Sequence, residues 1–377
     1  MVAREALSDR VTRALRRSPI VALIGPRQCG KTTLAKTLLE GRPSTYFDLE
    51  DPTAALLMQN PMTALSGLSG LVVIDEAQRC PDLFPVLRVL VDQQDCSASY
   101  LILGSASPEH SRQASETLAG RVEIVEMGGF DCGEISRDGA RSLWIRGGFP
   151  RSFLADSDED SLAWRRNFVR TFLERDLAQL GFAISPQAMG RFWTMLSHYH
   201  AQTWNGNEIA SSMGIAPNTA RRYLEALEQA LMIRRLLPWY VNVGKRLVKT
   251  PKIYFRDSGL FHTLQGIGAY GDLLVHPKLG ASWEGYVLEQ ALRIFPREDA
   301  YFYAVHSGSE LDLYIPTRRL GIEIKRQDAP KVTRSMRIAT EDLELDRLLI
   351  IYPGERRYTL DARIDVIPES ELRTVGE

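Results

Sequence analysis

The chain has 377 residues, of which 44% are hydrophobic and 25% are charged, a balance typical of a globular protein with two or three domains. The formal net charge is −1 at pH 7, which excludes a globally basic nucleic-acid-binding protein, so any affinity for phosphates must be local. No apolar run approaches the ~18 residues of a membrane span, and the four cysteines show no CxxC spacing. We therefore expect a cytoplasmic protein with no membrane partner, zinc site or disulfide framework.

A nucleotide-binding loop is predicted near the N-terminus. The apolar segment 20–25 is typical of a buried parallel strand, and it leads into a GxxxxGK[ST] pattern followed by a helical pattern. In this context, backbone N–H groups wrap phosphates, Lys31 reaches the β- and γ-phosphates, and Thr32 ligates Mg²⁺. The predicted loop consists of Gly25, Pro26, Arg27, Gln28, Cys29, Gly30, Lys31, Thr32 and Thr33.

A pair of acidic residues follows the next buried strand. The segment LVVIDEAQRC, residues 71–80, places Asp75 and Glu76 after four apolar residues. Parallel sheets bind ligands at the carboxyl ends of their strands, so both side chains are expected near the loop. Asp75 can hold Mg²⁺, usually through water, and Glu76 can polarise the water that attacks the γ-phosphate. The loop and the acidic pair together predict hydrolysis of a nucleoside triphosphate.

Three further positions bear on this site. Ser105 lies near the end of the apolar segment 100–107, where it is either a sensor of the γ-phosphate or a plain strand-end hydroxyl. Arg121 opens another strand and can act as an arginine finger on the nucleotide of a neighbouring subunit. Arg112 is the competing candidate, and a surface charge is the remaining interpretation for either arginine.

Six motifs follow one another between residues 25 and 153: GPRQCGKTTL, YFDLED, VVIDEAQ, GSAS, LAGR and GGFPRSF. The ordered set resembles the AAA+ ATPase superfamily. It is most similar to bacterial and archaeal ATPases that join an AAA-type module to a domain of unknown function numbered 4143. The resemblance implies ATP and Mg²⁺ as cofactors and a homo-oligomer with active sites between subunits. A hexamer is the assembly we expect.

The middle of the chain carries a helix-turn-helix pattern. Residues 205–236 repeat apolar positions at helical spacing, with Gly214 at a sharp turn and Pro217 at a first helical position. A β-wing is expected from 236 to 255. Residues 205–256 hold nine basic and three acidic residues, a local charge suited to phosphates. DNA contact is predicted for four residues that face away from the apolar side, Asn218, Thr219, Arg221 and Arg222. The alternative is that this region packs against protein.

The C-terminal third shows an acid-x-Lys pattern. A helix is expected over 279–295, with Glu284 inside its apolar arc and Glu289 well off it. The predicted α-β-β-β-α-β order resembles the PD-(D/E)xK nuclease fold. The resemblance implies that Glu284, Asp312 and Glu323 hold one Mg²⁺ or Mn²⁺ ion, with Lys325 beside it. Retained cleavage and retained DNA association without cleavage both stay open, and we favour the second.

These patterns predict an α/β fold. It comprises a P-loop AAA+ module with a parallel sheet, a helical winged-helix region, and a small α/β nuclease-like domain. The expected boundaries are 1–130 for the ATPase core, 131–185 for a helical lid, 186–265 for the winged helix and 266–377 for the nuclease-like domain. The expected function is an ATP-driven oligomeric machine that remodels DNA. A nucleotide-gated regulatory or defence switch and an ATP-regulated nuclease are the alternatives.

Overall fold

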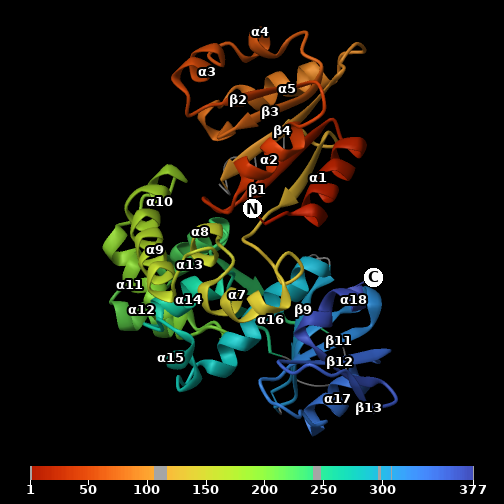
Figure 1. The fold of residues 1–377 in the computed structure, drawn as a ribbon. Helices are drawn as coiled ribbons and strands as arrows, with labels where there is room; N and C mark the ends of the chain where they lie inside the picture. The colour runs from red at the N-terminus through yellow and green to blue at the C-terminus, as the bar shows by residue number, and fades with distance from the viewer. Residues whose placement is uncertain (1, 106–116, 241–247, 296–298, 307, 377) are drawn as a thin grey trace. The chain divides into compact units, whose positions relative to one another are not determined.

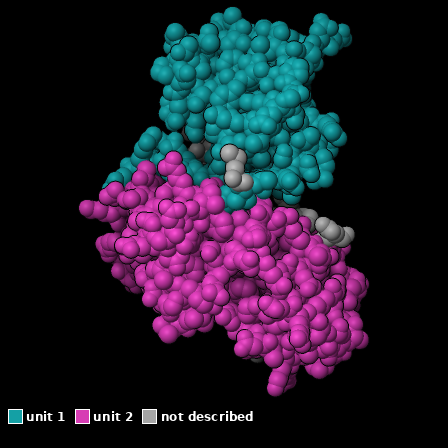
Figure 2. All heavy atoms as spheres, viewed as in Figure 1, with its two compact units in different colours: residues 1–130, 174–183, 229–231 teal, residues 131–173, 184–228, 232–377 magenta. Residues whose placement is uncertain are grey.

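Figure 1 shows the computed structural model, which describes residues 2–105, 117–240, 248–295, 299–306 and 308–376. The chain forms two compact units, coloured teal and magenta in Figure 2. Unit 1 consists of residues 1–130, 174–183 and 229–231. Unit 2 consists of residues 131–173, 184–228 and 232–377. It therefore includes most of the three regions expected after residue 130, whose boundaries at 185 and 265 stay predictions.

Unit 1 is built on a five-stranded parallel sheet in the order β2-β3-β4-β1-β5. The strands are β1 (Ile20–Gly25), β2 (Ser44–Asp48), β3 (Gly70–Asp75), β4 (Ala98–Ser105) and β5 (Val122–Glu126). Gly25 at the end of β1 pairs with Ser105 of β4, and Ile102 of β4 pairs with Ile74 of β3. The carboxyl ends of β1 and β3 therefore lie at one edge of the sheet. This confirms the predicted α/β fold with a parallel sheet.

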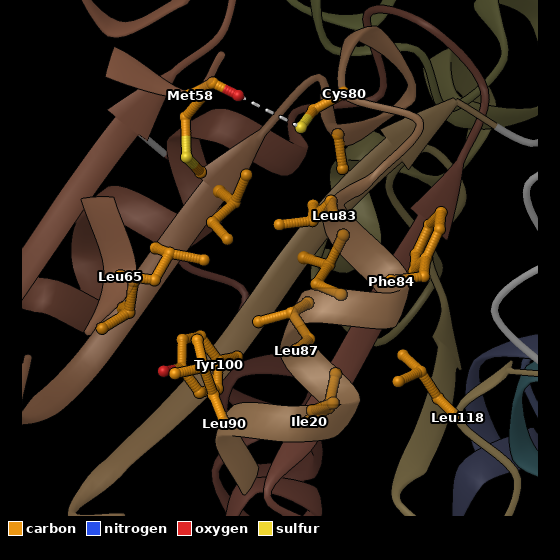
Figure 3. Close-up of a cluster of buried hydrophobic side chains, with 14 of the residues drawn as sticks. Ile20, Met58, Leu65, Cys80, Leu83, Phe84, Leu87, Leu90, Tyr100 and Leu118 are labelled. Atoms are coloured by element: carbon orange, nitrogen blue, oxygen red, sulfur yellow. Dashed lines mark hydrogen bonds between the residues drawn. The ribbon is translucent and has the colours of Figure 1, made fainter. Parts of the chain in front are cut away.

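The helices of unit 1 connect and cover these strands. They are α1 (Glu5–Arg17), α2 (Lys31–Leu39), α3 (Pro52–Leu57), α4 (Pro61–Leu65), the 3-10 turn η1 (Ala77–Arg79) and α5 (Leu83–Val91). Unit 1 also includes the short helix α10 (Leu177–Gln179). Figure 3 shows the core in which the apolar face of α5 packs against strand residues such as Ile20 and Tyr100. The Cys80 thiol donates to the Met58 carbonyl at 3.5 Å in the same cluster. This packing anchors the turn that follows Asp75 and Glu76.

The first part of unit 2 is mainly helical and carries a small antiparallel sheet in the order β6-β8-β7. Its elements run η2 (Arg137–Gly139), α7 (Ala140–Arg146), α8 (Pro150–Phe153), α9 (Asp158–Thr171), α11 (Pro186–Ser197), β6 (Gln202–Thr203), α12 (Gly206–Met213), α13 (Pro217–Gln229), β7 (Ile233–Leu236), β8 (Lys252–Phe255), α14 (Ser258–Leu264) and α15 (Tyr270–Leu274). A π-helical turn, η3 (Phe172–Asp176), continues α9. Gly214 ends α12 with φ 68°, at the turn where the sequence predicts a sharp change of direction.

The second part of unit 2 is a six-stranded mixed sheet in the order β13-β14-β12-β11-β10-β9. Its elements are α16 (Leu279–Ile294), β9 (Tyr301–Ala304), β10 (Glu310–Ile315), η5 (Pro316–Arg318), β11 (Leu320–Ile324), α17 (Arg334–Asp342), β12 (Arg347–Tyr352), β13 (Tyr358–Asp361), β14 (Ile364–Pro368), η6 (Glu369–Glu371) and α18 (Leu372–Gly376). The predicted helical region followed by a further α/β sheet is confirmed. Among the described residues, no helix combines the length and apolar character needed to cross a membrane.

Candidate functional site

The loop between β1 and α2 has the backbone that the glycine pattern predicts. Gly30 adopts φ 100° immediately before Lys31 begins α2, and Gln28 adopts φ 62°. A Cβ on Gly25 would lie 2.4 Å from the carbonyl oxygen of Met127. Only glycine fits a close approach of this kind, and glycine also enters the left-handed region at the lowest cost. The two glycines of the motif therefore shape a tight loop that ends at a helix N-terminus.

Lys31 lies inside this loop. Its side chain is 7% exposed, and its Nζ donates to the carbonyl oxygens of Gly25 and Pro26, both at 2.9 Å. A buried ammonium is costly unless polar partners surround it, and here the loop itself supplies them. The charge is thus held where backbone N–H groups and a helix N-terminus favour an anion.

Asp75 is fixed at the end of β3 by three hydrogen bonds. Thr32 Oγ1 donates to Asp75 Oδ2 at 2.6 Å, and the Tyr46 hydroxyl donates to the same oxygen at 2.8 Å. The backbone N–H of Glu76 donates to Asp75 Oδ1 at 2.9 Å. Mg²⁺ prefers hydroxyl, carboxylate and water oxygens, so Thr32 and Asp75 fit this ion. The sequence motif YFDLED contains Tyr46, but nothing in the pattern alone indicated that its hydroxyl supports Asp75.

Glu76 has an unusual backbone and a polar surrounding. Its φ is 54°, a conformation that non-glycine residues adopt at a cost and that occurs often at functional sites. Burial raises the pKa of its carboxyl, and the cations of Arg27 and Lys31 offset part of that rise. Gln78 Nε2 also donates to Glu76 Oε2. The carboxylate is therefore held in place beside the loop.

Arg27 connects this carboxylate to a distant part of the chain. Its Nη2 lies 3.9 Å from Glu76 Oε2, and its Nη1 lies 2.7 Å from Asp176 Oδ1. Asp176 is buried and belongs to the segment 174–183 of unit 1. The sequence offered no signal for Asp176, because 149 positions separate it from Arg27.

The acidic residues predicted for a nuclease-like site lie close together in unit 2. Asp312 comes from β10 and Glu323 from the neighbouring β11, and Lys325 Nζ lies 2.5 Å from Glu323 Oε1. Asp312 Oδ2 accepts the backbone N–H of Ile324 at 2.8 Å. Burial, reinforced by the charge of Asp312, raises the pKa of Glu284 to about 7 and that of Glu323 to about 8.

A residue that the sequence reasoning missed lies among these carboxylates. Lys252 Nζ, from β8, is 3.3 Å from Glu284 Oε1 and 3.8 Å from Asp312 Oδ1, and it also pairs with Glu310. The Tyr254 hydroxyl donates to Glu284 Oε1 at 2.6 Å. An ammonium in this position repels a divalent ion, so the cluster as arranged does not fit Mg²⁺ or Mn²⁺. In the parts of the chain that the structure describes, no group of three or more His, Cys, Asp or Glu residues is arranged to hold a metal.

Comparisons with known proteins agree with this architecture. A family described as "AAA domain" matches residues 17–136, and two families described as domains of unknown function, DUF8612 and DUF4143, match residues 137–270 and 279–372. The proteins called Rv2008c of Mycobacterium tuberculosis (strain ATCC 25618 / H37Rv) and Mb2031c of Mycobacterium bovis (strain ATCC BAA-935 / AF2122/97) are each 51% identical to this chain. Each match covers 100% of the chain and 86% of the relative, and both relatives are called uncharacterized.

The chain belongs to the family of ATPases that join an AAA domain to DUF4143. A solved structure, described as a Walker-type ATPase from Pyrococcus abyssi, supports the fold of this AAA–DUF4143 ATPase. The TM-score is 0.52 at 15% identity, and the alignment covers 70% of this chain and 96% of that one.

In this AAA–DUF4143 ATPase, Arg121 lies at the end of the sheet opposite the loop. It precedes Val122, which pairs with Ile20 at the start of β1. The six residues from Ile20 to Gly25 are five steps of extended strand, which span ~16 Å. Arg121 binds Asp92 of its own chain through Nε at 2.7 Å and Nη2 at 2.9 Å.

The Ser105 side chain and all of Arg112 lie outside the described residues.

The four residues predicted to contact DNA lie on α13. Asn218, Arg221 and Arg222 are exposed and Thr219 is partly exposed. The surrounding positive charge is smaller than the sequence suggests, because several basic residues form ion pairs inside unit 2. Arg234 and Arg256 pair with Glu289, Arg235 pairs with Glu228, and Lys252 lies in the carboxylate cluster.

Proposed function

We propose that this AAA–DUF4143 ATPase is one subunit of an oligomeric machine that hydrolyses ATP and remodels DNA. The observation that carries the proposal is the arrangement at one edge of the parallel sheet. Lys31, the Thr32–Asp75 pair and Glu76 lie within one short stretch of that edge. Lys31 binds the β- and γ-phosphates, Thr32 and Asp75 hold Mg²⁺, and Glu76 orients the attacking water. Held by Thr32 and Asp75, Mg²⁺ would supply positive charge against the negative charge that develops on the phosphates.

The position of Arg121 supports an oligomer. It is a strand length away from the loop of its own chain, too far to touch a nucleotide bound there. An arginine finger at this position must therefore serve the nucleotide of an adjacent subunit, as the hexamer expected from the sequence requires. The Asp92 carboxylate orients the guanidinium in the isolated chain.

The order of elements between α11 and β8 supports a role for DNA. Helix, strand, two helices and two strands follow one another, which is the order of a winged helix-turn-helix. The second helix of the pair, α13, presents Arg221 and Arg222 to solvent. Two exposed guanidinium groups on a recognition helix suit the phosphate backbone, to which they add affinity without reading bases.

The experiment that tests the proposal measures ATP turnover by the purified chain against duplex, forked and four-way junction DNA. Oligomeric state is measured alongside by light scattering with ATP bound. A DNA-remodelling machine turns over ATP faster with at least one of these structures and forms a ring-sized assembly. Equal turnover with and without every DNA would rule out the remodelling role.

One observation favours a second candidate, a nucleotide-gated regulatory switch. Lys252 balances the carboxylates that an ATP-regulated nuclease would need for a metal, so a non-cleaving C-terminal domain suits a switch better than a nuclease. A switch hydrolyses ATP slowly whatever DNA is present, and its nucleotide state changes its assembly. The same turnover experiment therefore separates the two candidates.

A further inference from the structure

Lys252 is a lysine with an unusual number of acidic neighbours for a buried position. It is 4% exposed, and its Nζ faces Glu284, Glu310 and Asp312. It also lies 5.6 Å from the centre of the Phe302 ring. Burial alone lowers the pKa of this ammonium, but Tyr254 and then the surrounding carboxylates hold it well above its ordinary value. The side chain is therefore charged at neutral pH, inside the group of acids.

The ammonium and a divalent ion would compete for the same place. Mg²⁺ needs oxygen ligands at about 2.0–2.1 Å in near-octahedral geometry. Glu284 Oε1, which would be one ligand, already accepts from Tyr254 and lies 3.3 Å from Lys252 Nζ. Asp312 Oδ2, a second ligand candidate, accepts the backbone N–H of Ile324. These two oxygens thus already have donors from the protein itself.

One atom of the cluster lacks a donor. Glu323 Oε2 is buried and has no hydrogen-bond partner among the described residues. The opposite oxygen, Oε1, binds Lys325 Nζ at 2.5 Å. The ammonium of Lys325 already balances the charge of this carboxylate, so a divalent ion at Oε2 would lie next to that ammonium. The two lysines therefore balance the charge of Glu284, Asp312 and Glu323 without a metal, and Glu323 Oε2 is the atom that they leave unpaired.

Lys252 also reaches the cluster from a different part of unit 2. It belongs to β8 of the three-stranded sheet, while Asp312 and Glu323 belong to the six-stranded sheet. Lys252 lies outside the DUF4143 match, which begins at residue 279. A metal on Glu284, Asp312 and Glu323 would join α16 to the six-stranded sheet, whereas this ammonium also ties in the three-stranded sheet.

We propose that Lys252 is a built-in cation that replaces the divalent metal of the acidic cluster formed by Glu284, Asp312 and Glu323. The C-terminal domain then does not cleave phosphodiesters. The cluster serves instead as an ionic joint between the wing strand β8 and the six-stranded sheet. The proposal stands apart from the nucleotide site, so a failure of the DNA-remodelling role leaves it unaffected.

The test is a titration of the full-length, nucleotide-free chain with Mn²⁺ alone, followed by electron paramagnetic resonance. Wild type and Asp312→Asn should give the same binding curve, because the acidic cluster takes up no ion. Lys252→Ala should gain one Mn²⁺ bound roughly tenfold more tightly than any ion on the wild type, since oxygens then lack their cation. Adding Asp312→Asn to Lys252→Ala should abolish this gain. Lys249→Ala, which removes an exposed lysine three residues away, is the matched control and should behave as wild type.

Either of two results would overturn the inference. The first is a Mn²⁺ ion on the wild type that Asp312→Asn removes, or wild-type DNA cleavage that needs Mn²⁺ and Asp312. The second is a folded Lys252→Ala protein that gains no ion. If Lys252→Ala does not fold, the comparison of wild type with Asp312→Asn still decides the matter.

Discussion

Replacing Lys31 by alanine should weaken ATP binding by about a hundredfold, and the structure sets this size. Lys31 Nζ makes two hydrogen bonds in the loop, to Gly25 and Pro26, and it exchanges them for phosphate oxygens when a nucleotide binds. A hydrogen bond to a charged group contributes about 1.5–3 kcal/mol, so two contacts give about 3–6 kcal/mol before the exchange is counted. Because the lysine gives up two carbonyl partners, we expect the lower end, which corresponds to roughly 100-fold in Kd.

The assay is a fluorescence titration with a labelled ATP analogue in the presence of Mg²⁺. Lys36→Ala is the matched control, because it removes a lysine from the same helix at an exposed position. The thermal midpoint of each protein is measured to separate lost binding from lost folding. Tight ATP binding by a folded Lys31→Ala protein would refute the assignment of Lys31 to the phosphates.

Four further outcomes are expected. Glu76→Gln should bind ATP normally but turn it over at least about 100-fold more slowly, since a water-orienting group is lost; normal turnover in a phosphate-release assay would show that another residue orients the water. When Arg121→Ala and Glu76→Gln proteins are mixed, some interfaces combine an intact Glu76 with an intact Arg121 from the adjacent subunit, and part of the ATPase activity should return. No recovery in mixtures whose subunits exchange would point to Arg112 instead. The double variant Arg221→Ala/Arg222→Ala should reduce the log–log salt slope of DNA binding by roughly one per lost contact, unlike the control Arg191→Ala on α11; an unchanged slope would favour protein packing. Burial lowers the pKa of both His200 and His262 to about 3. The neutral imidazoles therefore stabilise the fold fully above pH ~6.5, and the free energy of unfolding falls by about 2 kcal/mol for each histidine between there and pH 5. Equal unfolding free energies in urea at pH 7 and pH 5 would contradict this.

The parts of the molecule that could be predicted from sequence are those whose functional residues are neighbours in the chain. Residues 25–33 are a single loop, and their glycines, lysine and threonine have a local physical role that the pattern itself conveys. The order from α16 to β12 also follows from local periodicity, whereas β13, β14 and α18 were not predicted. The contacts of Asp176 and Lys252 could not be predicted, because each depends on a partner far away in sequence.

Glu289 shows a second limit. Helical periodicity places it off the apolar arc of α16, yet it is 5% exposed and binds Arg234 Nε at 2.5 Å, with Arg256 Nε at 3.7 Å. Most residues of α16 are buried, including those on the side of the helix away from its apolar arc. The same ion pairs use part of the basic charge that the sequence count assigned to a DNA-binding surface. A count of charges does not reveal which of them neutralise one another.

The hydrogen bond between Thr32 and Asp75 also fixes the orientation of the Thr32 hydroxyl. A hydroxyl has one hydrogen and two lone pairs, and Thr32 gives its hydrogen to Asp75 Oδ2. Its lone pairs are thereby turned away from the carboxylate and remain available to a cation. Asp75 would thus act on a bound Mg²⁺ by orienting a neighbouring oxygen, as expected of a carboxylate that reaches the ion through water. Serine at position 32 would keep this orientation, whereas valine, with the same shape and no hydroxyl, would leave the ion one ligand short.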